Sequence, residues 1–227
     1  MNAYLTALET DLRAAADPAK AAPMAAYLRD QFPFLGLNAP GRTAVLKAHR
    51  ADHGPPPPDQ LDGIVRGLWA LPEREFQQAG ADLLKQGKRG LTPDHLPLLR
   101  HTLTHKSWWD TVDVLAAHPV GAIFARYPKN RAETVSQWRD DPNIWLRRTT
   151  LLFQLFYKDQ TDAPLLFSLI EQNRGDDEFF IQKAAGWALR QYSKTDATAV
   201  VDFVARSDLS PLAEREALKW LKKQGKL

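Results

Sequence analysis

Apolar side chains recur three and four positions apart along most of the chain, which is the spacing of helices that bury one face. Proline, glycine or Asp-Pro residues interrupt this spacing about every ten to fifteen positions. Alternation typical of a strand is not found. The pattern therefore predicts an all-α protein of many short helices. The clearest predicted helices cover residues 2–16, 73–86, 107–117, 144–157, 178–192 and 211–223.

Four consecutive prolines, Pro55 to Pro58, form the stiffest predicted connection. Such a run cannot lie inside a helix, so we expect a surface loop there, followed by a helix over about residues 61–71. We do not interpret it as a domain boundary. A folded chain of 227 residues buries roughly 70% of the surface of its unfolded form, enough for one core without a metal or a disulfide. We expect a single domain over residues 1–227.

Composition excludes several classes of protein. With 44% hydrophobic and 25% charged residues, the chain is neither disordered nor collagen-like, and no apolar run reaches the roughly 18 residues that span a bilayer. The absence of cysteine excludes disulfide scaffolds, thiolate zinc sites, iron–sulfur clusters and cysteine nucleophiles. The start of the sequence lacks a secretory signal, so we expect a cytoplasmic protein. A net charge of +3 permits nucleic-acid binding without implying it.

A weak repeat links three helices. Trp109, Arg148 and Trp187 each depart from their local helical pattern, and they follow one another at intervals of 39 residues. A period near 40 is typical of HEAT-like helical repeats. The pattern therefore predicts an α-solenoid of HEAT-like antiparallel helix pairs, whose concave face suits an extended ligand.

Arg148 stands where a leucine is expected. On a helical wheel it lies among Ile144, Leu151 and Leu155, whereas its neighbour Arg147 lies on the polar side. An arginine on an apolar face needs an anionic partner. Two interpretations remain open, a buried ion pair within the core and a clamp that grips a phosphate with two N–H groups.

Two tryptophans carry polar neighbours at helical spacing. Trp109 and Asp113 are four positions apart, which places an indole beside a carboxylate. Trp187 lies away from the apolar face of its helix, together with Lys183 and Arg190. This second tryptophan either packs against another helix or contacts a sugar or base beside a phosphate backbone.

The common catalytic motifs are missing. The sequence contains no GxxxxGK[ST], GxGxxG, HExxH or GxSxG motif. His101, His105 and His118 do not make a convincing metal site, because no carboxylate or thiolate accompanies them at the spacing of a ligand. We therefore expect neither a metal nor a cofactor.

Three segments resemble one family of repair enzymes. SWWDTVD at 107–113, NIWLRRT at 143–149 and FFIQKAAGWALRQY at 179–192 are similar to AlkD-type DNA alkylation-repair glycosylases. The likeness continues in stretches at 27–37, 73–84 and 209–221, so it covers essentially the whole chain. It implies a solenoid of HEAT-like repeats and a monofunctional glycosylase, which releases 7-methylguanine and 3-methyladenine from duplex DNA to begin base excision repair.

The resemblance also implies roles for individual residues. Trp109, Asp113 and Arg148 match the catalytic triplet of the family, and Trp187 matches its second tryptophan. Together with Arg148, we expect four residues to contact DNA: Trp187, Lys183, Arg190 and Tyr27, although Tyr27 equally suits packing between helices. Asn38 stands where relatives often carry a longer amide, so we leave it outside the catalytic set.

The chemistry expected of these residues follows from charge. Alkylation at N7 or N3 makes the purine a cation, which departs as a neutral base without a strong general acid. Asp113 would then stabilise the positive charge that develops at the sugar C1′ and orient the attacking water. The resemblance implies that the lesion stays stacked rather than being extruded into a pocket. The catalytic triplet contains no lysine, so no Schiff base and no strand cleavage are expected.

The expected partner is duplex DNA that contains alkylated purines. We expect a monomer in the cytoplasm, associated with the nucleoid when bound to DNA, and no interaction with membranes. The alternatives are a HEAT-repeat scaffold that binds DNA without excising bases and a repeat protein that binds another protein. A carboxylate facing a polyanion argues against both, because it weakens binding and is useful only to a catalyst.

Overall fold

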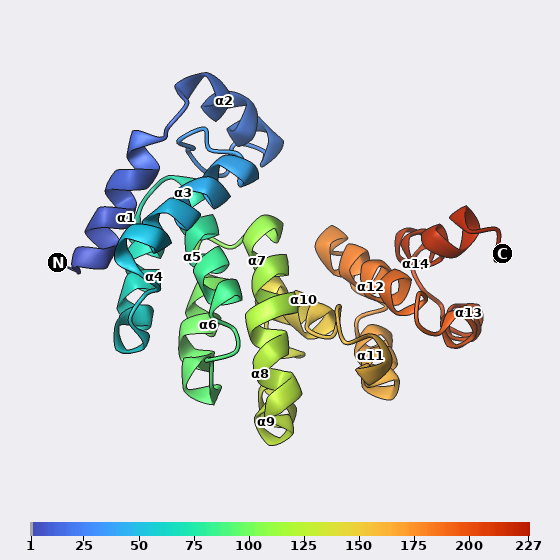
Figure 1. Ribbon diagram of the computed structural model, residues 1–227. Coiled ribbons are helices and arrows are strands. Elements are labelled where there is room, and N and C mark those ends of the chain that lie inside the picture. The colour runs from blue at the N-terminus through green and yellow to red at the C-terminus, as the bar shows by residue number, and fades with distance from the viewer. Residues whose placement is uncertain (1) are drawn as a thin grey trace. The chain divides into compact units, whose positions relative to one another are not determined.

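The computed structural model describes residues 2–227, and these residues form helices and no strand, which confirms the predicted all-α fold (Figure 1). Their contacts divide the chain into two compact units. The first unit comprises the chain up to Gly87 together with Pro97–Lys106, and the second comprises Lys88–Leu96 and Ser107–Leu227. The single domain over residues 1–227 stays a prediction.

The first unit packs its helices around α1. Helix α1 contacts α3, α4 and α5, and the core between them includes Leu8, Leu12, Ile64, Leu68 and Phe76, none of which is exposed to solvent. Asn2 caps α1 by accepting a hydrogen bond from the backbone N–H of Leu5, as expected of an N-cap asparagine. The α-helices of this unit are α1 (Ala3–Ala14), α2 (Pro18–Tyr27), α3 (Ala39–His53), α4 (Leu61–Ala70), α5 (Arg74–Gln86) and α6 (Leu96–Thr104).

A buried carboxylate fixes the segment between α2 and α3. Glu75, which is fully buried, accepts hydrogen bonds of 2.8–2.9 Å from the backbone N–H groups of Leu35, Gly36 and Leu37. Gly36 has a φ of +94°, and a Cβ atom there would lie 1.9 Å from the carbonyl oxygen of Asp17, so glycine is required. The stretch at 27–37 that resembles the repair family is thus explained in part by folding.

The second unit stacks its helices in two layers. Helix α7 contacts α10, α10 contacts α12, and α12 contacts α14, while α9, α11 and α13 pack beside them. In Figure 1, α12 and α14 lie side by side near the C-terminus. Within this unit, the arrangement is solenoid-like. The α-helices are α7 (Trp109–Leu115), α8 (Gly121–Arg126), α9 (Pro128–Trp138), α10 (Ile144–Leu152), α11 (Ala163–Gln172), α12 (Phe179–Tyr192), α13 (Ala197–Arg206) and α14 (Pro211–Lys223).

Two predicted helices end differently in the structure. Helix α10 ends at Leu152, before the predicted end at residue 157, because the side chain of Gln154 hydrogen-bonds both the N–H and the carbonyl of Asp162 and holds the chain in a turn. Helix α7 passes at Ala116 into a single π-helical turn, Ala116–Val120. Pro119, which lacks an N–H group, lies inside that turn.

The proline run behaves as predicted at its start. Residues 55–57 lie outside any helix, and Pro58 opens a short 3₁₀ turn, Pro58–Gln60, that leads directly into α4.

Across residues 2–227, no helix is both long and apolar enough to span a membrane.

Candidate active site

A cavity of about 330 Å³ lies in the second unit. It brings together every predicted site residue except Tyr27. Its lining consists of Trp109 and Asp113 from α7, Arg148 from α10, Phe179, Phe180, Lys183, Trp187 and Arg190 from α12, and Glu216 from α14. The three residues at intervals of 39 therefore reach one cavity from three helices that pack in sequence, α7, α10 and α12.

Helical spacing explains how these side chains converge. Trp109 is the first residue of α7 and Asp113 lies one turn later, so both project from the same side of the helix. On α12, Lys183, Trp187 and Arg190 follow the i, i+4, i+7 spacing of one face. The apolar face of α12, by contrast, is buried.

Asp113 and Arg148, which both line the cavity, form a two-pronged ion pair. The Nε of Arg148 donates to Oδ1 of Asp113 over 2.7 Å, and its Nη2 donates to Oδ2 over 2.9 Å. The Nη1 of Arg148 donates to the carbonyl of Phe180 at the start of α12. Only 5% of the Arg148 side chain and 14% of the Asp113 side chain are exposed. The buried-ion-pair interpretation of Arg148 is therefore confirmed.

The same geometry leaves Arg148 with unused donors. A guanidinium has five N–H groups, and the three hydrogen bonds to Asp113 and Phe180 engage one group on each nitrogen. The remaining two N–H groups are not used by these three hydrogen bonds. The ion pair and the phosphate clamp are thus compatible, and the clamp stays a prediction.

Burial raises the pKa of the Asp113 carboxyl above its ordinary value, and the hydrogen bonds and charge of Arg148 oppose this shift without cancelling it. The nearby Asp110 adds to the increase. A carboxylate with a raised pKa accepts a proton more readily than an exposed aspartate does. Asp113 is therefore a suitable group to take a proton from water.

Aromatic rings support the ion pair from the side of α12. Phe180 packs against Trp108 and Trp145, with ring centroids 5.1 and 5.0 Å apart, and the guanidinium carbon of Arg148 lies 5.9 Å from the Phe180 ring. Phe179, Phe180 and Glu216 also line the cavity and were not predicted from the sequence. The doubled phenylalanine directly before the predicted α12 face was the one visible signal.

A second carboxylate in the lining, Glu216 on α14, pairs with two cations of α12. Its Oε1 lies 2.9 Å from Nζ of Lys183, and its Oε2 accepts a hydrogen bond from Arg190. Burial of Glu216 acts to raise its pKa, but the two cations outweigh burial and hold the pKa below the ordinary value. Lys183 and Arg190, predicted to contact DNA, are thus engaged with a carboxylate of the protein. Their contact with DNA stays a prediction.

A close helix approach puts Glu216 at the cavity. A Cβ atom at Gly186 of α12 would lie 2.6 Å from the Ala213 carbonyl oxygen and 2.6 Å from the Cβ of Glu216. Only glycine permits α14 to pack this tightly on α12. Glu216 therefore reaches Lys183 and Arg190 because residue 186 has no side chain.

Tyr27 and Asn38 lie outside this cavity. Tyr27 is at the end of α2 in the first unit, where 74% of the residue is exposed. Asn38 is the N-cap of α3, and its side chain accepts a hydrogen bond of 3.0 Å from the N–H of Gly41. Asn38 thus has a role in folding, and a DNA contact by Tyr27 stays a prediction.

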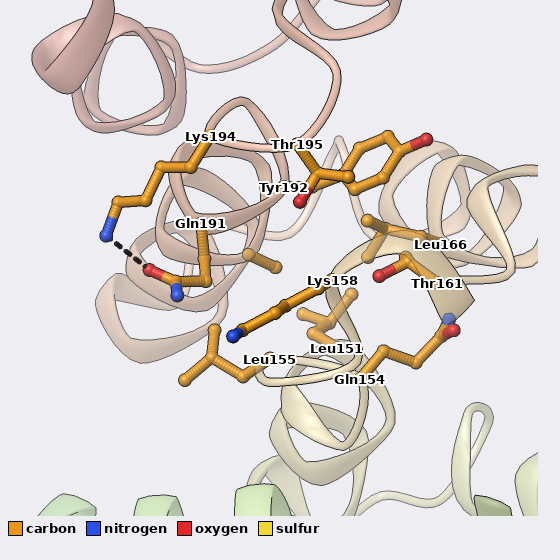
Figure 2. A pocket seen from close by; sticks show the side chains of 11 residues that line it. Leu151, Gln154, Leu155, Lys158, Thr161, Leu166, Gln191, Tyr192, Lys194 and Thr195 are labelled. Atoms are coloured by element: carbon orange, nitrogen blue, oxygen red, sulfur yellow. Dashed lines mark hydrogen bonds between the residues drawn. The ribbon is translucent and has the colours of Figure 1, made fainter.

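Figure 2 shows a second cavity, of about 200 Å³, in the same unit. Leucines including Leu151, Leu155 and Leu166 give it an apolar wall. Lys158 lies across its middle, and Lys194 at its edge donates to Gln191. In the part of the chain that the structure describes, its lining includes no carboxylate and none of the predicted site residues. The cavity around Asp113 is therefore the better candidate for catalysis.

The chain is similar to proteins that are described as DNA alkylation repair enzymes. The family model described as DNA alkylation repair enzyme matches residues 8–221. A solved structure described as a predicted DNA alkylation repair enzyme from Enterococcus faecalis is similar, with 35% sequence identity and a TM-score of 0.84, covering 92% of this chain and 97% of that chain. None of the curated proteins compared with the chain matches it. The family match includes both units and all residues that line the cavity around Asp113.

Proposed function

Since this chain belongs to the family of DNA alkylation repair enzymes, we propose that it is a monofunctional DNA glycosylase for cationic alkylated purines in duplex DNA. Its substrates are 7-methylguanine and 3-methyladenine, and its product is an abasic site that enters base excision repair. One observation carries the proposal. A buried carboxylate with a raised pKa is held by two hydrogen bonds at a cavity flanked by Trp109 and Trp187.

The reaction breaks one bond and forms another. The bond between C1′ and the purine nitrogen breaks, and its electron pair goes to the base, which leaves neutral because alkylation had made it a cation. Positive charge develops on C1′, where Asp113 stabilises it. A water oxygen then bonds to C1′ while its proton passes to Asp113 and on to solvent.

The other lining residues bind and orient the nucleotide. The faces of Trp109 and Trp187 attract the developing cation, an effect worth about 0.5–2 kcal/mol for each ring. Arg148 holds Asp113 in place and offers its two remaining N–H groups to the neighbouring phosphate. The base remains stacked in the duplex. The protein works as a monomer in the cytoplasm and needs no cofactor for this chemistry.

The absence of a strong acid for the leaving base restricts the substrates. An uncharged base such as uracil leaves only with help from a proton donor, so uracil is not released. In the described residues that line the cavity, Lys183 is the one primary amine, and it is paired with Glu216. No Schiff base forms and the DNA strand stays intact.

The test is release of free 7-methylguanine from methylated duplex DNA by the wild type, Asp113→Asn and Asp110→Asn. Asp110 is the matched control because it is an aspartate on the same helix that does not line the cavity. We expect release by the wild type and by Asp110→Asn at neutral pH, loss in Asp113→Asn, and strand breaks only after alkali. Tight DNA binding without release by the wild type would identify a non-catalytic scaffold instead.

A further inference from the structure

Two histidines and an aspartate meet where α1 packs against α3 in the first unit. Asp11 lies on α1, and His49 and His53 lie one turn apart on α3. One potential ligand atom from each of these three side chains lies within 4.8 Å of the other two. Within residues 2–227, no other group of three such side chains meets this condition. None of the three lines the cavity around Asp113.

The environment of His49 is unusual for a structural histidine. The residue is 2% exposed, and its Nδ1 lies 2.6 Å from Oδ2 of Asp11. Its Nε2 is buried and has no hydrogen-bond partner. The edge of Tyr4 and the face of His53 enclose the ring, with centroids 4.6 and 4.5 Å from that of His49. A buried polar atom left unpaired costs free energy, so His49 is an uncommon feature of this core.

The side chains of this group are suited to a metal ion. Imidazole nitrogens and carboxylate oxygens are ligands that zinc commonly takes in proteins, at about 2.0–2.2 Å from the metal, and this group offers two imidazoles at i and i+4 of one helix and a carboxylate from a helix that packs against it. Ligand atoms already within 4.8 Å of one another need only small side-chain rotations to reach one ion. The negative charge of Asp11 partly neutralises a divalent cation, and solvent reaches the site because His53 is exposed and 42% of the Asp11 side chain is exposed.

We propose that Asp11, His49 and His53 form a binding site for one divalent transition-metal ion, best suited to Zn²⁺, that ties α1 to α3. The site is structural, because it shares no residue with the cavity around Asp113. The sequence carried the signal as a His-x-x-x-His spacing at 49–53, but the third ligand lies on another helix, 38 residues before His49.

The chain offers a matched control. His101 and His105 on and after α6 have the same spacing, and their rings stack with centroids 4.2 Å apart. They belong to no group of three possible ligands in the described part of the chain. His105→Ala therefore removes a stacked histidine without touching the proposed site.

The experiment uses full-length protein stripped with a chelator and then titrated with ZnCl₂ by calorimetry, with thermal unfolding followed in parallel. We expect one Zn²⁺ per chain and a rise in Tm for the wild type and for His105→Ala. Because a ligand is lost, His53→Ala should bind Zn²⁺ at least about tenfold more weakly and lose the rise in Tm. Asp11→Asn should weaken binding by about 10–100-fold.

Three results would overturn the proposal: no binding by the wild type, equal binding by His53→Ala and the wild type, or equal loss in His53→Ala and His105→Ala. His53 is exposed at the end of α3, so the alanine variant should fold. The readout does not involve DNA, and failure here leaves the proposed glycosylase activity unaffected.

Discussion

Two buried carboxylates line the same cavity, but they differ in the number of cations that surround them. Asp113 faces one guanidinium, and burial raises its pKa. Glu216 faces two cations, Lys183 and Arg190, which outweigh burial and lower its pKa. Asp113 is therefore suited to exchange a proton during the reaction, whereas Glu216 stays ionised and holds Lys183 and Arg190 in place.

The largest effect should come from removing Arg148, the cation that pairs with Asp113. Arg148→Ala leaves the Asp113 carboxylate buried without its partner, which should lower the free energy of unfolding by about 3–5 kcal/mol. Urea unfolding measures this loss. The pKa of Asp113 should rise further, so base release should need a higher pH than in the wild type.

A double variant sharpens this prediction. Arg148→Ala combined with Asp113→Asn removes the uncompensated charge, and it should be more stable than Arg148→Ala alone. If the double variant loses the sum of the two single effects, the two side chains are not coupled and the buried ion pair does not explain the position of Arg148.

The next largest effect should come from disturbing the packing of α14 on α12, which positions Glu216. Gly186→Ala places a Cβ atom 2.6 Å from the carbonyl oxygen of Ala213, so α12 and α14 must separate. Overpacking of this kind should lower the free energy of unfolding by about 2 kcal/mol. The rate of base release per folded molecule should change much less, because Asp113 and Arg148 lie on α7 and α10. A gain in stability would show that α14 is not held where the structure places it.

Glu216→Gln should have a smaller effect on stability, about 1 kcal/mol, since the two cations that it frees are partly exposed to water. Freed cations should bind DNA phosphates. We expect tighter DNA binding with a steeper dependence on salt concentration, measured by fluorescence anisotropy. An unchanged salt dependence would show that Lys183 and Arg190 do not reach DNA.

The difference in stability between the wild type and Glu216→Gln should depend on pH. The pKa of folded Glu216 lies below the ordinary value of 4.5, so its ionised form stabilises the fold above that pH and the benefit disappears as pH falls through the folded pKa. The wild type should therefore exceed Glu216→Gln in stability at neutral pH and lose this advantage in acid. Asp113, with a raised pKa, has the opposite sign: its contribution is present below the ordinary value of 3.8 and lost as pH rises.

The smallest expected effect concerns Asp110. Its charge helps to raise the pKa of Asp113, so Asp110→Asn should lower that pKa slightly. The acid side of the rate–pH profile for base release should shift to lower pH, with the rate at neutral pH unchanged. A shift to higher pH would contradict the role of Asp113 as the ionised group.

Much of this site could be predicted from helical spacing. Arg148 on an apolar face and Trp109 beside Asp113 are visible in the sequence, since both follow from 100° steps along a helix. The carbonyl of Phe180 and the carboxylate of Glu216 were not predicted, because they depend on how α12 meets α10 and α14. The metal ligands Asp11, His49 and His53 were missed for the same reason.

The boundaries of the helices were also predicted only in part. The predicted start of α10 at Ile144 and both ends of α12 and α14 are within a residue of the structure. The end of α10 was wrong because the buried Gln154 binds Asp162 and turns the chain, although the apolar spacing continues to Leu155. Local pattern predicts a helix, whereas a contact with the following loop ends it.

The role of Asp113 is tested most directly by comparing Asp113→Asn with Glu216→Gln in one assay, the single-turnover release of 7-methylguanine from duplex DNA. Both variants neutralise a buried carboxylate of the same cavity. We expect Asp113→Asn to lower the rate by about 100-fold or more, and Glu216→Gln to change it by less than about tenfold. Equal losses in the two variants would contradict the claim that Asp113 alone carries the chemistry.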